Sequence, residues 1–112
     1  MITMHDSNIL QRQVLTCQKP AVVLFTASWS GTGQQIDPLL ECIEKEHEDR
    51  IAFYRLYAED DLSIDRLFGV YMLPTVVLYC DGTPIEYLVG MNDLMRLRDL
   101  LCEIDTKDQA PA

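Results

Sequence analysis

The 112-residue sequence lacks closely spaced cysteines. Its four cysteines, Cys17, Cys42, Cys80 and Cys102, lie far apart along the chain. No pair therefore has the two-residue spacing that is typical of a zinc knuckle or a redox dithiol. A cytosolic chain of this size seldom forms disulfides, so we expect four reduced thiols, most of them partly buried. The sequence predicts no metal site and no cofactor.

Positive charge is also scarce. Nine Lys and Arg residues stand against 18 Asp and Glu residues, which gives a formal net charge of -9. Because nucleic-acid binding requires a basic face, this balance argues against a nucleic-acid partner. A surplus of acidic residues most often serves solubility, and it also suits a basic protein partner.

Long apolar runs are missing as well. No segment approaches the ~20 apolar residues of a membrane-spanning helix, so no membrane contact is expected. Residues 1–10 lack the basic and apolar regions of a signal peptide, which favours a cytoplasmic protein. The length and an ordinary globular composition, 48% hydrophobic and 24% charged, predict one domain over residues 1–112.

Hydrophobic periodicity predicts a chain in which helices alternate with strands. The helices are expected over residues 7–17, 33–48, 60–69 and 92–104. The strands are expected over residues 21–25, 51–57, 75–80 and 84–89, and an edge strand over 2–5 would be the fifth. Asp6 or Ser7 is expected to cap the first helix, Gly69 to end the third, and residues 105–112 to form a frayed tail.

This order of elements predicts a mixed sheet. Two strands joined through a helix imply a parallel, right-handed crossover, and the hairpin around residues 81–83 adds antiparallel strands. We therefore expect an α/β fold in which four or five strands carry helices on both faces.

Three segments resemble the thioredoxin family. "VVLFTASWSGTG" (22–33) is similar to its strand, Trp and redox loop, and "FGVYMLPTVVLYCDG" (68–82) is similar to its segment with a proline before a strand. "YLVG" (87–90) followed by Met91 resembles the end of the last strand. The resemblance covers nearly the whole chain and implies a thioredoxin-like fold.

The loop departs from the family pattern W-C-G-P-C. This chain has Trp29, Ser30, Gly31, Thr32 and Gly33 at those places. Thiol–disulfide exchange requires a thiolate, and neither serine nor glycine forms a mixed disulfide. Redox chemistry at this loop is therefore excluded, and we expect that the chain is not an enzyme. Leu24 also stands where redox members of the family carry a buried acidic residue that serves the thiol. Without the thiol, a buried carboxylate would only cost stability, so an aliphatic residue is favoured there.

Structural roles are expected for the other residues of this region. Ser30 is expected to cap the helix that follows, and Gly31 and Gly33 to permit a tight turn with positive φ. Arg55 stands near a lysine of redox members, and we expect it to pair with a local acid. Pro38 falls inside the long helix and is read as structural, because the family commonly has a proline there.

The resemblance implies a surface that receives an extended peptide. Pro74 matches a proline that is typically cis, and the backbone of Leu73 would pair with a partner strand. Methionine adapts its shape to several apolar sequences, although packing of Met72 and Met91 in the core is an equal alternative. The predicted peptide-binding residues are Trp29, Ser30, Gly31, Tyr71, Met72, Leu73, Pro74 and Met91.

Three hypotheses follow for function. The first is a non-redox, chaperone-like adapter that binds an extended protein or peptide, as a monomer or weak dimer. The alternative is a thiol-dependent oxidoreductase or transferase that uses a remaining cysteine such as Cys80, taken here as the most exposed candidate. The third is a subunit that dimerises through the same groove.

Overall fold

The computed structural model describes residues 1–58 and 63–109, apart from the side chains at positions 32, 48 and 105–109. The described residues form four α-helices, one 3-10 helix and five strands. The helices are α1 (Ser7–Thr16), α2 (Gly31–His47), α3 (Ile64–Phe68) and α4 (Gly90–Gln109), with the 3-10 helix at Glu48–Arg50. The strands are β1 (Ile2–Met4), β2 (Ala21–Thr26), β3 (Ala52–Tyr57), β4 (Thr75–Cys80) and β5 (Thr83–Val89).

The strands form one mixed sheet in the order β1-β3-β2-β4-β5. Strand β3 runs parallel to both β1 and β2, whereas β4 runs antiparallel to β2 and β5. The β4–β5 hairpin turns at Asp81 (φ 53°) and Gly82 (φ 77°), and two positive φ angles match the right-handed twist of paired strands. The thioredoxin-like mixed sheet is thus confirmed, with five strands.

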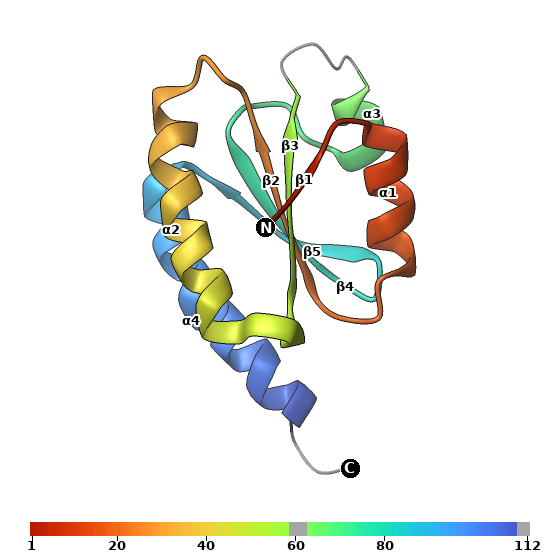
Figure 1. Ribbon diagram of the computed structural model, residues 1–112, viewed down its shortest axis with the longest axis vertical. Helices are drawn as coiled ribbons and strands as arrows, with labels where there is room; N and C mark the ends of the chain where they lie inside the picture. The colour runs from red at the N-terminus through yellow and green to blue at the C-terminus, as the bar shows by residue number, and fades with distance from the viewer. Residues whose placement is uncertain (59–62, 110–112) are drawn as a thin grey trace.

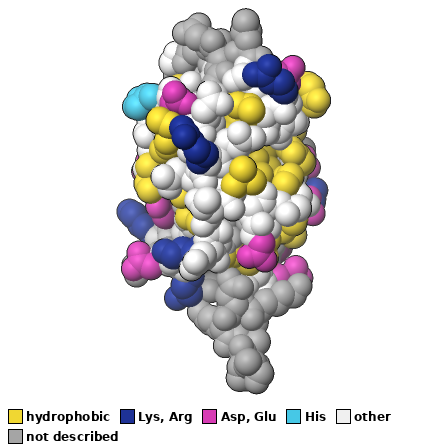
Figure 2. All heavy atoms as spheres, turned by 90° about the vertical axis from the view of Figure 1, so that its right-hand side faces the viewer, with side chains coloured by type: hydrophobic (Ala, Val, Ile, Leu, Met, Phe, Trp, Pro, Cys, Tyr) yellow, Lys and Arg dark blue, Asp and Glu magenta, His cyan; other side chains and the backbone are white. Residues whose placement is uncertain are grey.

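Helices cover both faces of the sheet. Helices α2 and α4 lie on one side and α1 and α3 on the other (Figure 1). Every residue of β2 is buried because this central strand is covered on both faces: Val23 and Phe25 face α1 and α3, while Val22 and Leu24 face α2 and α4. The side that carries α1 and α3 still exposes hydrophobic side chains near its middle (Figure 2).

The ends of α1 and the C-terminal ends of α2 and α3 agree with the sequence to within one residue. In contrast, α2 begins at Gly31 instead of residue 33, Ser63 lies outside α3, and both ends of α4 differ from the prediction. Asp6 caps α1, since its Oδ1 accepts hydrogen bonds from the amides of Asn8 and Ile9. Gly69 ends α3 in the left-handed region, with φ 70°. Helix α4 continues to Gln109 instead of ending near residue 104, and residues 110–112 of the predicted tail lie outside the described residues. Residues 60–62 of the predicted third helix lie outside them too. No described helix is long and apolar enough to cross a bilayer.

Candidate functional site

The carboxyl end of β2 brings three separate segments together. Phe25, near the end of β2, pairs with Thr75 at the start of β4, and Thr75 also pairs with Val89 at the end of β5. The loop after β2, the residues before β4 and the start of α4 therefore meet at one end of the sheet. The eight residues predicted to bind a peptide come from these three segments, and we refer to them together as the Trp29 surface.

Three large side chains of the Trp29 surface are exposed. The exposed fraction is 69% for Trp29, 80% for Tyr71 and 63% for Met72. Met72 is therefore not a core residue. Met91 differs, because it is half-buried and packs against the core beneath α2 and α4. An exposed cluster of this kind is typical of a contact surface for another macromolecule.

The backbone between Met72 and Thr75 is fixed in shape. The Leu73–Pro74 peptide bond is cis, and the hydroxyl of Thr75 donates a hydrogen bond of 2.6 Å to the carbonyl of Met72. Pro74 is buried, while Leu73 is half-buried against the core beneath α1 and α3. The segment thus presents Met72 outward from a firmly held turn.

Ser30 points inward, unlike Trp29. Its exposed fraction is only 6%, and its hydroxyl oxygen accepts a hydrogen bond of 2.9 Å from the amide of Gly33. Its carbonyl accepts a further hydrogen bond from the amide of Gln34. Ser30 is therefore the N-cap of α2, as the sequence predicted, and contributes no exposed group to the Trp29 surface.

The expectation of positive φ at Gly31 and Gly33 is wrong. Both residues lie in the first turn of α2, and neither is among the glycines with positive φ. A side chain at Gly31 would meet nothing within 4 Å. A Cβ at Gly33, in contrast, would collide with the hydroxyl of Thr26. Glycine is needed at position 33 because β2 approaches the helix closely, which sequence spacing does not reveal.

Arg55 pairs with acidic residues of α2, as predicted. Its guanidinium group donates hydrogen bonds to Asp37, to Glu41 at 3.0 Å and to the hydroxyl of Thr3 at 2.9 Å. Burial alone would lower the pKa of Arg55, but the hydrogen bond and charge of Asp37, aided by Glu41, raise it above its ordinary value. This network ties β3 to α2 and β1, which is a structural role.

The four cysteines are thiols, and their exposure differs from the expectation. Cys42 and Cys102 are exposed, whereas Cys17 and Cys80 are only partly exposed. The expectation that Cys80 is the most exposed cysteine is therefore wrong, since Cys42 on α2 and Cys102 on α4 are the exposed ones. Cys80 also lies at the opposite end of β4 from Pro74, so it cannot act on a peptide held at the Trp29 surface.

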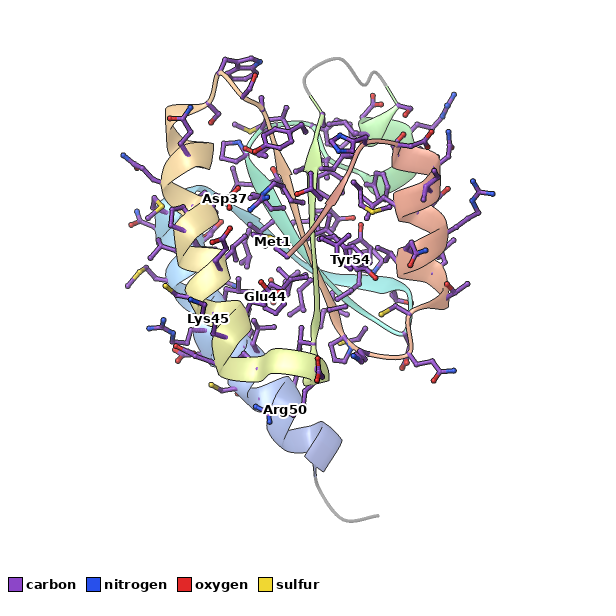
Figure 3. The ribbon with its side chains drawn as sticks, in the orientation of Figure 1. Met1, Asp37, Glu44, Lys45, Arg50 and Tyr54 are labelled. Atoms are coloured by element: carbon purple, nitrogen blue, oxygen red, sulfur yellow. The ribbon has the colours of Figure 1, made fainter. Side chains whose placement is uncertain are left out.

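A pocket of about 690 Å³ surrounds a different cysteine, and sequence reasoning missed it. Cys17, Lys19, Lys45 and Tyr54 line this pocket, which we call the Cys17 pocket. Tyr54 lies on the side of β3 that faces α1 (Figure 3). Burial raises the pKa of Tyr54, and the charge of Cys17 and its hydrogen bond to Tyr54 add to the effect. These residues come from separate parts of the chain, so no local motif could have indicated the pocket.

Comparisons with known proteins give the family. The profile of the thioredoxin family, described as "Thioredoxin", matches residues 1–103. A thioredoxin of Alicyclobacillus acidocaldarius is 27% identical over 103 residues, which cover 92% of this chain and 96% of that relative. A thioredoxin of Mycobacterium bovis is 34% identical over 77 residues, covering 69% of this chain and 66% of that relative. The chain spans half the length of a chloroplastic M-type thioredoxin of Brassica napus, which is 27% identical.

Solved structures show the same fold. A thioredoxin of Malassezia sympodialis superimposes with a TM-score of 0.79 at 24% identity, covering 94% of this chain and 91% of that one. A mutant thioredoxin of Halobacterium salinarum superimposes with a TM-score of 0.78, also at 24% identity, covering 93% and 89% of the two chains. Both likenesses support the mixed five-stranded sheet with its covering helices.

The family corrects one expectation from the loop. Ser30 and Gly33 led us to expect that the chain is not an enzyme, but the matching relatives are named thioredoxin, and thioredoxins exchange thiols and disulfides. Membership therefore points toward redox chemistry. The expectation failed because it treated one loop as the only place where a thiol could react. With its profile matched over residues 1–103, this chain belongs to the thioredoxin family.

Proposed function

We propose that this protein is a thiol-dependent oxidoreductase or transferase that exchanges disulfides through a single cysteine, Cys17. The family supports the reaction type. The observation that carries the choice of residue is the Cys17 pocket, in which the thiol lies within hydrogen-bonding reach of the Tyr54 hydroxyl. Its volume of about 690 Å³ lies in the range of about 300–1,000 Å³ that small-molecule sites occupy.

The charges of the Cys17 pocket favour a small zwitterionic disulfide. Lys19 and Lys45 supply positive charge to its lining, and Glu44 and Asp49 supply negative charge. Glu44 lies between α2 and the β1–β3 edge (Figure 3). A disulfide of amino acids or short peptides carries both ammonium and carboxylate groups, so it complements such a lining.

The reaction needs only one protein thiol. The thiolate of Cys17 attacks one sulfur of the substrate disulfide, the S–S bond breaks, and the other half leaves as a thiolate. An external thiol then attacks the mixed disulfide and regenerates Cys17. The other cysteines fit less well: Cys42 and Cys102 are on exposed helix positions, and Cys80 does not line the Cys17 pocket.

Mixed-disulfide mapping tests the proposal. The protein is incubated with cystine at neutral pH and the adduct is located by peptide mass spectrometry. We expect the adduct at Cys17 in the wild type and its loss in Cys17→Ser, whereas Cys42→Ser should react like the wild type. Modification that prefers Cys42 or Cys102, or that is unchanged in Cys17→Ser, would contradict the proposal.

A second function is supported by the Trp29 surface: the binding of an extended polypeptide. The exposed Trp29, Tyr71 and Met72 supply adaptable apolar contacts beside the backbone of Leu73. The net charge of -9 favours a partner with basic residues. This binding is compatible with thiol exchange, because the Trp29 surface and the Cys17 pocket are separate places on the molecule.

Fluorescence tests this second function directly. Trp29 is the only tryptophan, so its emission reports on contacts at this surface. We expect a blue shift when an unfolded, basic polypeptide without tryptophan, such as reduced and alkylated ribonuclease A, is added. Met72→Asp should weaken the binding, whereas Met95→Asp, at an even more exposed position of α4, should not. If the two substitutions weaken binding equally, the Trp29 surface is not the binding site.

A cytoplasmic location is supported by the cysteines. All four are thiols in the structure, and the two on the outer surfaces of α2 and α4 are exposed. Exposed thiols persist where glutathione and thioredoxin systems keep the environment reducing. Localisation with a fluorescent tag in the native cell would test this placement.

A further inference from the structure

A cavity lies between α1, α3 and the β4–β5 hairpin. Its volume is about 250 Å³, and its lining includes Val14, Leu15, Phe68, Tyr79 and Tyr87 together with one polar amide side chain, that of Gln11. None of the described residues that line it is charged. It opens on the side of the molecule that carries α1 and α3, where hydrophobic side chains gather (Figure 2). We call it the Tyr79 cavity, and it is distinct from both the Trp29 surface and the Cys17 pocket.

The two tyrosines of this cavity differ in their hydrogen bonds. The hydroxyl of Tyr87 donates a hydrogen bond of 2.9 Å to the carbonyl of Phe68. The hydroxyl of Tyr79 has no hydrogen-bond partner among the described residues, although the exposed fraction of Tyr79 is only 5%. Buried polar groups are nearly always satisfied, so an unpartnered hydroxyl beside a cavity indicates a missing partner.

We propose that the Tyr79 cavity binds a small neutral molecule with an apolar body and one hydrogen-bond acceptor, which takes the proton of the Tyr79 hydroxyl in a hydrogen bond. Three features of the cavity define this class of ligand. The mainly apolar lining selects an aromatic or short aliphatic body, and the unpartnered Tyr79 hydroxyl selects a hydrogen-bond acceptor on it. The uncharged lining, within a chain of net charge -9, disfavours an anion.

The size of the cavity narrows the ligand further. Its volume of about 250 Å³ is below the range of about 300–1,000 Å³ that holds drug-sized molecules. Apolar cavities of about 150 Å³ are known to stay dry and to bind benzene, so one substituted ring fits here. A buried water needs two to four polar partners, and this lining is mainly apolar.

The hydroxyl of Tyr79 is a hydrogen-bond donor at neutral pH and is not ionised. Burial raises the pKa of Tyr79 above its ordinary value, and the charge of Tyr87 acts in the same direction. The hydroxyl is also closed to bulk solvent, so a ligand reaches it only after a side chain at the rim moves. Leu15, a residue of the lining, is 58% exposed, so it is the side chain whose movement this proposal requires.

Titration by ¹H–¹⁵N NMR tests this proposal with benzyl alcohol as the probe and toluene as its apolar counterpart. We expect saturable shifts at Leu15, Phe68 and Gly82 with both compounds and tighter binding of benzyl alcohol. Tyr79→Phe should weaken the binding of benzyl alcohol about threefold to tenfold, the value of one hydrogen bond, and leave that of toluene unchanged. Tyr87→Phe should have a smaller effect, because its hydroxyl already has a partner.

A second variant keeps the outcome interpretable. Leu15→Trp fills the mouth of the cavity from an exposed position, so it should abolish the shifts while the protein remains folded. The proposal is overturned if benzyl alcohol gives no saturable shifts, if the shifts lie elsewhere, or if Tyr79→Phe binds it as well as the wild type. It is also overturned if a high-resolution crystal structure grown with benzyl alcohol shows only water beside Tyr79.

Discussion

The side-chain oxygen of Ser30 accepts a hydrogen bond from the amide of Gly33, with 2.9 Å between the two atoms, at the first turn of α2. This bond satisfies an amide that has no partner within the helix. We predict that Ser30→Ala lowers the free energy of unfolding by about 0.5–2 kcal/mol, measured by urea denaturation. Ser30→Thr retains an acceptor oxygen, so it should lower the free energy of unfolding less than Ser30→Ala does. Equal stability of Ser30→Ala and the wild type would mean that this cap contributes nothing.

Gly33 is held close to Thr26, and this contact gives a second prediction. A methyl group at position 33 would improve helix propensity by about 1 kcal/mol, but it would collide with the Thr26 hydroxyl, and overpacking costs about 1–3 kcal/mol. We therefore expect Gly33→Ala to lower the melting temperature. Gly31→Ala should not lower it, because nothing lies near its Cβ.

The partner of the collision can be removed. Thr26→Ala removes the hydroxyl with which a methyl group at position 33 would collide. The double variant Thr26→Ala/Gly33→Ala should therefore be more stable than the sum of the two single effects predicts. Thr26→Val keeps an atom where the hydroxyl stands and should give no relief. If the effects of Thr26→Ala and Gly33→Ala on stability are additive, the side chains at positions 26 and 33 do not interact.

The pair of Arg55 and Asp37 gives a third prediction. The exposed fraction is 15% for the Arg55 side chain and 19% for that of Asp37, whereas Glu41, the other acidic partner, is 55% exposed. A hydrogen bond between charged, largely buried groups contributes about 1.5–3 kcal/mol, and an exposed ion pair about 0–1 kcal/mol. Asp37→Asn should therefore destabilise the protein more than Glu41→Gln in urea denaturation. The reverse order would contradict the assignment of Asp37 as the main partner.

The arrangement of strands and helices could be predicted because it depends on patterns within single segments. Five consecutive apolar residues, 21–25, indicated a strand buried on both faces, and β2 is buried along its whole length. Asp6 and Gly69 indicated helix ends through their own chemistry. The end of α4 was missed because residues 105–109 offer no apolar periodicity, and the helix continues there by backbone hydrogen bonding.

The candidate sites depended on contacts between distant segments. Family resemblance placed Trp29, Tyr71 and Met72 on one surface, and all three are exposed. Nothing in the sequence indicated that Cys17 meets Tyr54, since the two residues lie far apart along the chain. The lack of a partner for the Tyr79 hydroxyl was equally hidden, because burial and hydrogen bonding follow from packing and not from residue type.

The two tyrosines of the Tyr79 cavity should respond oppositely to loss of their hydroxyls. Tyr87→Phe removes a hydrogen bond to Phe68 and should lower the free energy of unfolding by about 1 kcal/mol. Tyr79→Phe removes a buried hydroxyl without a described partner, so it should raise the free energy of unfolding by about 1 kcal/mol. Both changes preserve the ring, so packing is nearly constant. Destabilisation by Tyr79→Phe in urea denaturation would show that its hydroxyl has a partner in solution.

Alkaline pH should destabilise the protein through its buried tyrosines. The pKa of Tyr79 is raised by burial and by the charge of Tyr87, and that of Tyr54 by burial and by Cys17. Above the ordinary value of 10.0, the unfolded chain releases these protons while the folded chain retains them. The unfolded state then binds fewer protons, so stability is complete below pH 10 and falls as the pH rises toward the folded pKa values.

Measuring the free energy of unfolding between about pH 8 and about pH 11 tests this dependence. At about pH 11, a tyrosine that ionises only in the unfolded chain lowers the free energy of unfolding by about 1 kcal/mol. Tyr79→Phe should therefore reduce the loss of stability between about pH 8 and about pH 11 by about that amount. Tyr71→Phe is the matched control: Tyr71 is 80% exposed in the folded protein, so this change should leave the slope unaltered. If Tyr79→Phe and the wild type lose stability in parallel above about pH 10, the Tyr79 hydroxyl ionises as readily in the folded protein as in the unfolded chain.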